Sequence, residues 1–294
     1  MNLENIIKEI ESVDPEIYNK LDGRRAAMKN FVNFSGKIAL AAIPLAFGSM
    51  LNKAYASPSG TKDAITDVLN FALTLEFLEY EFYKAGLAAS TAGNLAIPTG
   101  APLAAINTIF NHEQAHVNFL KTTVTALGGT PVAFTGASFD FTAKGNFMNV
   151  FSDYGLFLAV AQTFEDTGVR AYKGQAGNLM SNKGVLTAAL NIHSVEARHA
   201  SHIRQMRNAY GAAYSSNSLI PTGVTLKPWI TGNQSGIGSP AVQASYNGEE
   251  LTTQAGVNII NVGGANVSAS AASEAFDEPL TKDQVVSIVT PFFK

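Results

Sequence analysis

Apolar residues recur every three or four positions in four long stretches of the chain, which is the pattern of helices with one buried face. Glycine and proline interrupt the pattern between the stretches: Gly93 follows the first, and Gly128 with Gly129 closes the second. The sequence therefore predicts four long helices, at about 61–92, 103–127, 149–175 and 181–210.

The lengths of the connections predict how these helices are arranged. The joints at Pro98-Thr-Gly100 and at GQAGNLMSNKG are short, so each should join two antiparallel neighbours. The middle joint has roughly 20 residues, which is enough to travel back along a whole helix. Two hairpins joined by one long crossover form the arrangement of ferritin-like four-helix bundles. We therefore expect an all-α fold of this type across residues 57–210.

The N-terminal segment has the features of an export signal. The stretch GRRAAMKNF carries Arg24 and Arg25, and an apolar run at 38–51 leads to an A-x-A site that ends at Ala56. Residues 1–56 thus resemble a twin-arginine signal, which predicts export to the periplasm. A membrane anchor is the alternative, but the apolar run is short for a span of about 20 residues, so no stable span is expected after signal removal.

The C-terminal segment differs in composition from the helical stretches. Residues 211–294 begin with a region rich in Gly, Ser, Asn and Thr that lacks helical periodicity. They end in FDEPLTKDQVVSIVTPFF, which predicts a short helix at 281–289. Because Trp229 and the terminal phenylalanines are apolar, we expect this mostly irregular extension to pack on the bundle.

Composition limits the chemistry that the chain can carry. Hydrophobic residues make up 46% and charged residues 15%, as in a well-buried protein. The net charge of −3 gives no basic field, which argues against a nucleic-acid partner. Since the chain has no cysteine, any metal would be held by histidine, carboxylate and water.

Two helices contain the same pair of polar residues. FNHEQAHVNFL carries Glu113 and His116, and VEARHASHI carries Glu196 and His199, each pair three residues apart. A three-residue step places both side chains on one face of a helix. One pair would be an ordinary ion pair, but its repetition in each predicted hairpin indicates a shared function.

The other helix of each hairpin carries a glutamate inside an apolar run. Glu76 lies in FALTLEFLEYEFY and Glu165 in FLAVAQTFEDTGVRAY. An isolated buried carboxylate is costly, so each must be paired, protonated or bound to a metal. Oxygen-rich ligands without thiolates favour iron or manganese. The sequence therefore predicts that two such ions are bound in the core by Glu76, Glu113, His116, Glu165, Glu196 and His199.

Several neighbouring residues leave alternatives open. Glu79 lies one turn after Glu76 and could replace it as a ligand or support the site. His193 lies on the same helix face as Glu196, and His112 and His202 are expected to be structural or to support the ligands. We expect Glu81 to face solvent, and Asp166 to face away from the metals unless it orients a histidine ligand. Tyr83 and Tyr172 are expected to pack in the core, with a redox-active role as the alternative. A metal-free bundle would instead require the four core glutamates to be protonated or paired, and Arg170 and Arg198 could pair with two of them.

Four segments together resemble the exported ferritin-like domain proteins akin to plant desiccation-related proteins: DVLNFALTLEFLEYEFY, FNHEQAHVNFL, FEDTGVRAYKG and VEARHASHIR. The resemblance covers about 61–210 and the FDEPLTKDQV tail, and it implies a carboxylate-bridged dimetal site. In such a site Glu113 and Glu196 would bridge both ions. Glu76 and Glu165 would then be terminal ligands, and His116 and His199 would each bind one of the ions.

The resemblance implies no particular reaction. The first hypothesis is a redox enzyme that acts on oxygen or peroxide as an oxidase, peroxidase or catalase-like protein. The alternatives are a metal-handling protein, and a non-enzymatic stress-related protein in which the metal only stabilises the bundle. No catalytic residue besides the ligands is predicted, and the glycine pairs lack the setting of a nucleotide-binding loop.

Overall fold

The computed structural model describes residues 62–213, 219–221, 224–254 and 256–294. The predicted signal segment, 1–56, lies outside these residues. The main elements are four long helices: α4 (Lys62–Thr91), α5 (Ala101–Ala126), α6 (Tyr154–Ala176) and α7 (Lys183–Ala213). The prediction of an all-α bundle with an irregular C-terminal region is confirmed.

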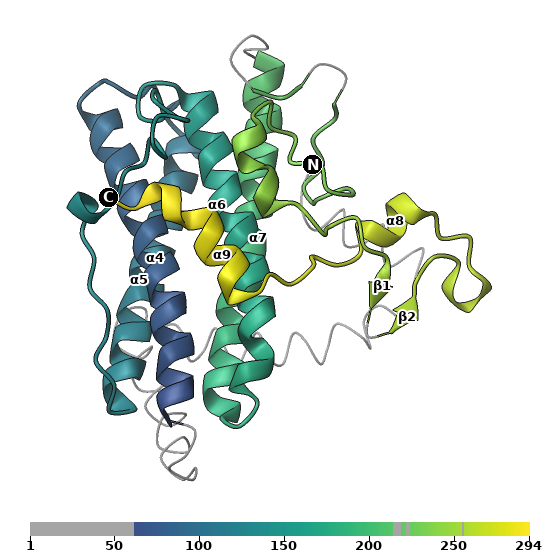
Figure 1. Ribbon diagram of the computed structural model, residues 1–294. Coiled ribbons are helices and arrows are strands. Elements are labelled where there is room, and N and C mark those ends of the chain that lie inside the picture. Colours follow the sequence, from purple (N-terminus) through teal and green to yellow (C-terminus); the bar gives the residue numbers. More distant parts are fainter. Residues whose placement is uncertain (1–61, 214–218, 222–223, 255) are drawn as a thin grey trace, which may run out of the picture. The chain divides into compact units, whose positions relative to one another are not determined.

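The helices pair as two hairpins (Figure 1). Helix α4 packs along α5, helix α6 packs along α7, and α4 also contacts α6. The connection between α5 and α6 runs back along the helices and contains only a short 3-10 helix, Gly136–Ser138. Because of this crossover, the two hairpins pack face to face. Side chains from all four helices can therefore meet in the core.

Helix α6 begins later than the apolar pattern indicates. The predicted start was near residue 149, but the chain forms consecutive turns up to Asp153. The Asp153 side chain accepts a hydrogen bond of 3.0 Å from the backbone N–H of Leu156 and so caps the helix. Phe147 and Val150 belong to these turns, and both side chains are buried. Their spacing of three residues resembles that of a helix, although no helix forms there.

Short elements make up the described C-terminal region. Strands β1 (Thr253–Gln254) and β2 (Val257–Asn258) pair antiparallel, with Thr253 opposite Asn258. Helix α9 (Lys282–Val289) matches the predicted terminal helix. Helix α8 (Ala269–Ser273) was not predicted; Ser268 caps it by accepting a hydrogen bond from Ala271. The remaining 3-10 helices are Gly177–Leu179, Pro240–Ser245, Val262–Gly264 and Thr290–Phe292.

The end of the chain lies on the bundle. Helix α9 crosses the face formed by α4 and α6 (Figure 1). Phe292 is buried, and its ring meets the Phe164 ring edge-on with centroids 4.7 Å apart. The prediction that Trp229 helps to anchor this region was wrong, because its side chain is 48% exposed.

A buried arginine on α6 makes several polar contacts with the C-terminal region. The Arg170 Nε lies 2.6 Å from the Glu249 carboxylate, and the guanidinium donates to the backbone carbonyls of Ser245, Asn247 and Glu278. Arg170 is 1% exposed, so these contacts replace all of its hydration. Arg170 is therefore committed to this region and does not neutralise the core carboxylates.

A second polar contact lies one turn earlier on α6. Asp166 accepts hydrogen bonds from Arg204 and, at 2.7 Å, from the hydroxyl of Tyr246. Gln162 donates to the same Tyr246 oxygen at 3.0 Å. Asp166 thus faces away from the bundle centre, as predicted.

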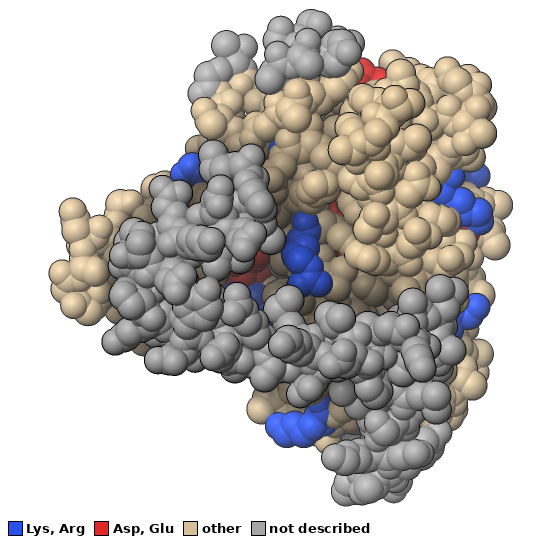
Figure 2. Space-filling view, turned by 180° about the vertical axis from the view of Figure 1, so that it is seen from behind, with Lys and Arg blue, Asp and Glu red and all other residues tan. Residues whose placement is uncertain are grey.

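The described surface gives little indication of function. On the face in Figure 2, Lys and Arg side chains lie scattered among uncharged residues. Among the described residues, none of the helices is both long and apolar enough to cross a membrane.

The contact between α6 and the C-terminal region yields a stability test. A Cβ atom on Gly174 would lie 1.9 Å from the backbone oxygen of Leu280, so Gly174→Ala should push this segment away. We expect the steric cost of about 1–3 kcal/mol to exceed the gain of about 1 kcal/mol in helix propensity, and urea unfolding should show a net loss. The control is Gly177→Ala, because nothing lies within 4 Å of that Cβ position. Equal stability changes in the two variants would contradict this packing.

Candidate metal centre

The six predicted residues come together in the middle of the four helices. They form two groups whose ligand atoms lie within 4.8 Å of one another: Glu76, Glu113, His116 and Glu196 in the first, and Glu113, Glu165, Glu196 and His199 in the second. Each helix supplies at least one glutamate, and the three-residue step adds a histidine on α5 and on α7. The two carboxylates shared by both groups are those of Glu113 and Glu196.

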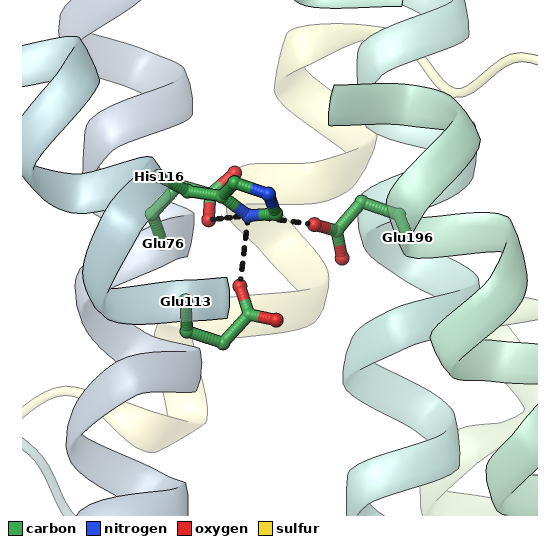
Figure 3. Close-up of side chains that lie close together, drawn as sticks. All are labelled: Glu76, Glu113, His116 and Glu196. Carbon is green, nitrogen blue, oxygen red and sulfur yellow. Dashed lines mark hydrogen bonds and ion pairs between the residues drawn. The ribbon is translucent and has the colours of Figure 1, made fainter. Parts of the chain in front are cut away.

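The first group surrounds one nitrogen of His116 (Figure 3). The Nδ1 atom lies 3.0 Å from Glu76 Oε2, 3.1 Å from Glu113 Oε2 and 3.1 Å from Glu196 Oε1. A ring nitrogen carries at most one hydrogen, so it cannot donate to all three oxygens. Three carboxylates and one imidazole that converge on one point form an arrangement suited to a metal ion.

The second group repeats this arrangement around His199. Its Nδ1 atom lies 2.8 Å from Glu113 Oε1 and 3.1 Å from Glu165 Oε2. Its other nitrogen, Nε2, lies 2.9 Å from Nδ1 of His112, an exposed residue on α5. Histidines that bind a metal usually donate their second N–H to a neighbour, and His112 is placed to accept it. Burial, followed by the effect of His199, lowers the pKa of His112, which favours the neutral, accepting form.

The residues present fit two metal ions. Glu113 and Glu196 are fully buried. The Oε1 atom of each lies near a histidine Nδ1 that other carboxylates also approach, and Oε2 of Glu196 has no hydrogen-bond partner among the described residues. Buried carboxylate oxygens without a donor are costly unless a cation neutralises them. Oxygen and imidazole ligands without sulfur suit iron or manganese. The clustering agrees with the prediction, and the role of these residues as ligands stays a prediction.

Two tyrosines connect the hairpins beside the site. The hydroxyl of Tyr83, on α4, donates to Glu165 on α6 at 2.5 Å. The hydroxyl of Tyr172, on α6, donates to Glu76 on α4. Burial and the adjacent carboxylates raise the pKa of both tyrosines well above 10, so both stay donors. The expectation that they pack in the core is confirmed, and each orients the carboxylate of the opposite hairpin.

Other candidate residues lie outside the two groups. Glu79 is buried beside them, whereas His193 is half-buried and His202 is exposed. The prediction that Glu81 faces solvent was wrong: it is buried and pairs with Lys84 at 3.1 Å. The contact between His112 and His199 was not predicted, because spacing along one helix carries no signal for a partner on another.

The buried charges shift the protonation of the site. Burial raises the pKa of Glu76 to about 7. Burial also raises the pKa of Glu196 well above 4.5, and the Glu113 carboxylate adds to this effect. Burial alone would lower the pKa of His199, but Glu165 and Glu113 outweigh it and raise the pKa to about 11. The metal-free site therefore holds protons near neutral pH.

Comparison with known proteins identifies the helical region. Residues 64–209 match the family model described as the ferritin-like domain. This span contains both groups of carboxylates and histidines. Neither a curated protein nor a solved structure matches the chain.

The protonation of the site predicts pH-dependent metal binding. A metal ion needs ionised carboxylates and an unprotonated imidazole nitrogen, so binding must release the protons held by Glu76 and His199. The affinity should rise with pH by about tenfold per pH unit for each proton released: Glu76 contributes only below about pH 7, whereas His199 contributes up to about pH 11, so the rise is steeper below pH 7 than above it. Calorimetric titration with Mn²⁺ in buffers of different ionisation enthalpy measures this release. An affinity independent of pH would contradict the assignment.

The hydrogen bond between the two histidines predicts unequal effects on the two ions. Removal of His112 leaves His199 without its partner, so His112→Ala should weaken the ion on the His199 side by about 10–100-fold. The ion on the His116 side should be unaffected. His202→Ala removes an exposed histidine of α7 and serves as the control. Wild-type affinity for both ions in His112→Ala would show that the bond does not support the ligand.

Proposed function

Residues 64–209 belong to the ferritin-like domain family, and from this premise we propose that the chain binds two iron or manganese ions for redox chemistry on oxygen or peroxide. Glu113 and Glu196 would be shared by both ions. Glu76 and His116 would complete the ligands of one ion, and Glu165 and His199 those of the other.

One observation carries this proposal: the carboxylates that both groups share crowd around single histidine nitrogens together with other carboxylates, and Oε2 of Glu196 has no hydrogen-bond partner among the described residues. If the four carboxylates are ionised, they balance two divalent cations. Protonation of the carboxylates could also remove their excess negative charge. It would not explain why several carboxylate oxygens converge on the same ring nitrogen of His116 or His199. When bound, iron or manganese would supply the change of oxidation state that chemistry on oxygen or peroxide requires.

The surrounding side chains support reactive chemistry. Tyr83 donates a hydrogen bond to Glu165, and Tyr172 donates one to Glu76. These two glutamates are the ones that belong to a single group. Phe82 stacks on Phe157 with centroids 4.9 Å apart and meets Phe164 edge-on at 5.1 Å. This aromatic cluster lies beside Tyr83 and limits the entry of water from the side of α4 and α6.

Access is more open on the side of α5 and α7. The four ligand carboxylates are fully buried, whereas the side chain of His116 is 10% exposed and that of His199 is 5% exposed. Such limited exposure admits a molecule the size of oxygen or peroxide more readily than a bulky substrate. This observation favours redox chemistry on a small molecule.

Export is part of the proposal and is supported by the sequence. Arg24 and Arg25, the apolar run and the A-x-A site resemble a twin-arginine signal. This route carries folded proteins, so the ions could be inserted before transport to the periplasm. A metal-handling or purely structural role would use the same ligands, because ions bound between the four helices would hold the two hairpins together.

Metal analysis tests the proposal and separates these roles. Protein purified from its native compartment should contain about two iron or manganese ions per chain, and a His116→Ala/His199→Ala variant should lose them. The loaded protein should turn over peroxide or oxygen, and the variant should not. Bound metal without turnover would favour the handling or structural role. A metal-free native protein would contradict the proposal.

A further inference from the structure

The two hairpins repeat each other with one informative exception. Glu76 and Glu165 are each followed after seven residues by a tyrosine, Tyr83 and Tyr172. Three residues after Glu76 the chain carries Glu79, whereas three residues after Glu165 it carries a glycine, Gly168. The first half therefore has an extra carboxylate one turn from a ligand, and the second half has no side chain at the matching position.

Because Gly168 has no side chain, the Glu79 carboxylate can occupy the space beside it. A Cβ atom at Gly168 would lie 3.2 Å from an oxygen of Glu79 and 3.4 Å from an oxygen of Glu196. The Glu79 carboxylate, from α4, and the Glu196 carboxylate, from α7, thus reach the same point on α6. Any side chain at this position would have to displace one of them.

Glu79 is buried among other carboxylates. It is 3% exposed, and after burial itself the strongest effects on its carboxylate come from other glutamates rather than from a cation. Glu81, two residues later, pairs with Lys84 and is thereby compensated. The charged groups that act most strongly on Glu79 are the carboxylates of Glu196 and Glu165. A carboxylate buried among carboxylates needs a cation if it is to be ionised.

These neighbours indicate which ion Glu79 would serve. Glu196 belongs to both groups, but Glu165 belongs only to the group of His199. Gly168, against which the Glu79 carboxylate lies, is one turn after Glu165 on α6, so Glu79 approaches the site from that side. We propose that Glu79 is an additional ligand of the ion on the His199 side, which it reaches through the space left open by Gly168. Its carboxylate lies outside the two groups in the described arrangement, so binding requires a change of its side-chain rotamer. The inference rests on the proposed function, because it requires ions in the site.

An additional carboxylate has a consequence for oxidation state. Four ionised carboxylates balance two divalent ions, and a fifth is balanced when one ion is trivalent. Glu79 would therefore stabilise the oxidised form of the ion on the His199 side. The two ions would then differ in both affinity and reduction potential, although their hairpins carry the same Glu-x-x-His motif.

The test is a Mn²⁺ titration of the full chain, with Glu79→Gln as the variant and Glu81→Gln as the control on the same helix. Glutamine keeps the shape of the side chain and removes its charge. In Glu79→Gln, one of the two ions should bind about tenfold or more weakly, and the other should keep its affinity. The metal-free variant should be at least as stable as the wild type, because a carboxylate buried among other carboxylates is removed. Glu81→Gln should keep both affinities.

A second variant tests the space rather than the charge. Gly168→Ala keeps Glu79 but places a methyl group against its carboxylate, and it should weaken the same ion. If the wild type binds two ions and both variants keep wild-type affinities, the assignment of Glu79 is wrong while the proposed function stands. If Glu79→Gln weakens both ions equally and destabilises the metal-free protein, Glu79 is structural. A wild type that binds no Mn²⁺ would overturn the proposed function itself.

Discussion

The buried carboxylates in the centre of the bundle are the constraint on which the rest of the structure depends. Five glutamates lie there, Glu76, Glu79, Glu113, Glu165 and Glu196, and none of them is more than 3% exposed. Two histidines and two tyrosines lie within hydrogen-bond distance of some of their oxygens, but each histidine Nδ1 is shared by several carboxylates, and among the described residues Oε2 of Glu196 has no partner. Without metal, the site must hold protons; with metal, it must release them. Folding, metal binding and pH are therefore coupled through the same few side chains.

The fold keeps other cations away from this centre. The long crossover sets the two hairpins so that each helix contributes a glutamate, and the tyrosines bond across from one hairpin to the other. The buried Arg170 and Arg204 lie on the side of the C-terminal region, where they pair with Glu249 and Asp166. The C-terminal region thus engages the guanidinium of Arg170, and Asp166 on α6 engages that of Arg204, so neither is paired with the core carboxylates.

The sequence contained enough information for the helices and the ligand cluster because both depend on local periodicity. A three-residue step places Glu113 and His116 on one face whatever surrounds them, and the loop lengths indicate the order of packing. Other features depend on contacts between distant segments and were missed: the burial of Glu81, the exposure of Trp229 and the bond from His112 to His199. The later start of α6 could have been predicted from a local signal, the capping residue Asp153. The helix-like spacing of apolar residues in the preceding turns obscured that signal.

We propose that two ions lie between the hairpins and share Glu113 and Glu196. Anomalous diffraction on crystals of protein from its native compartment, with data above and below the iron and manganese absorption edges, would locate and identify them. Two peaks flanked by these carboxylates are expected, one beside His116 and one beside His199, that identify one or both metals. Electron density for an ordered, metal-free cluster, with no anomalous peak at this position, would contradict it.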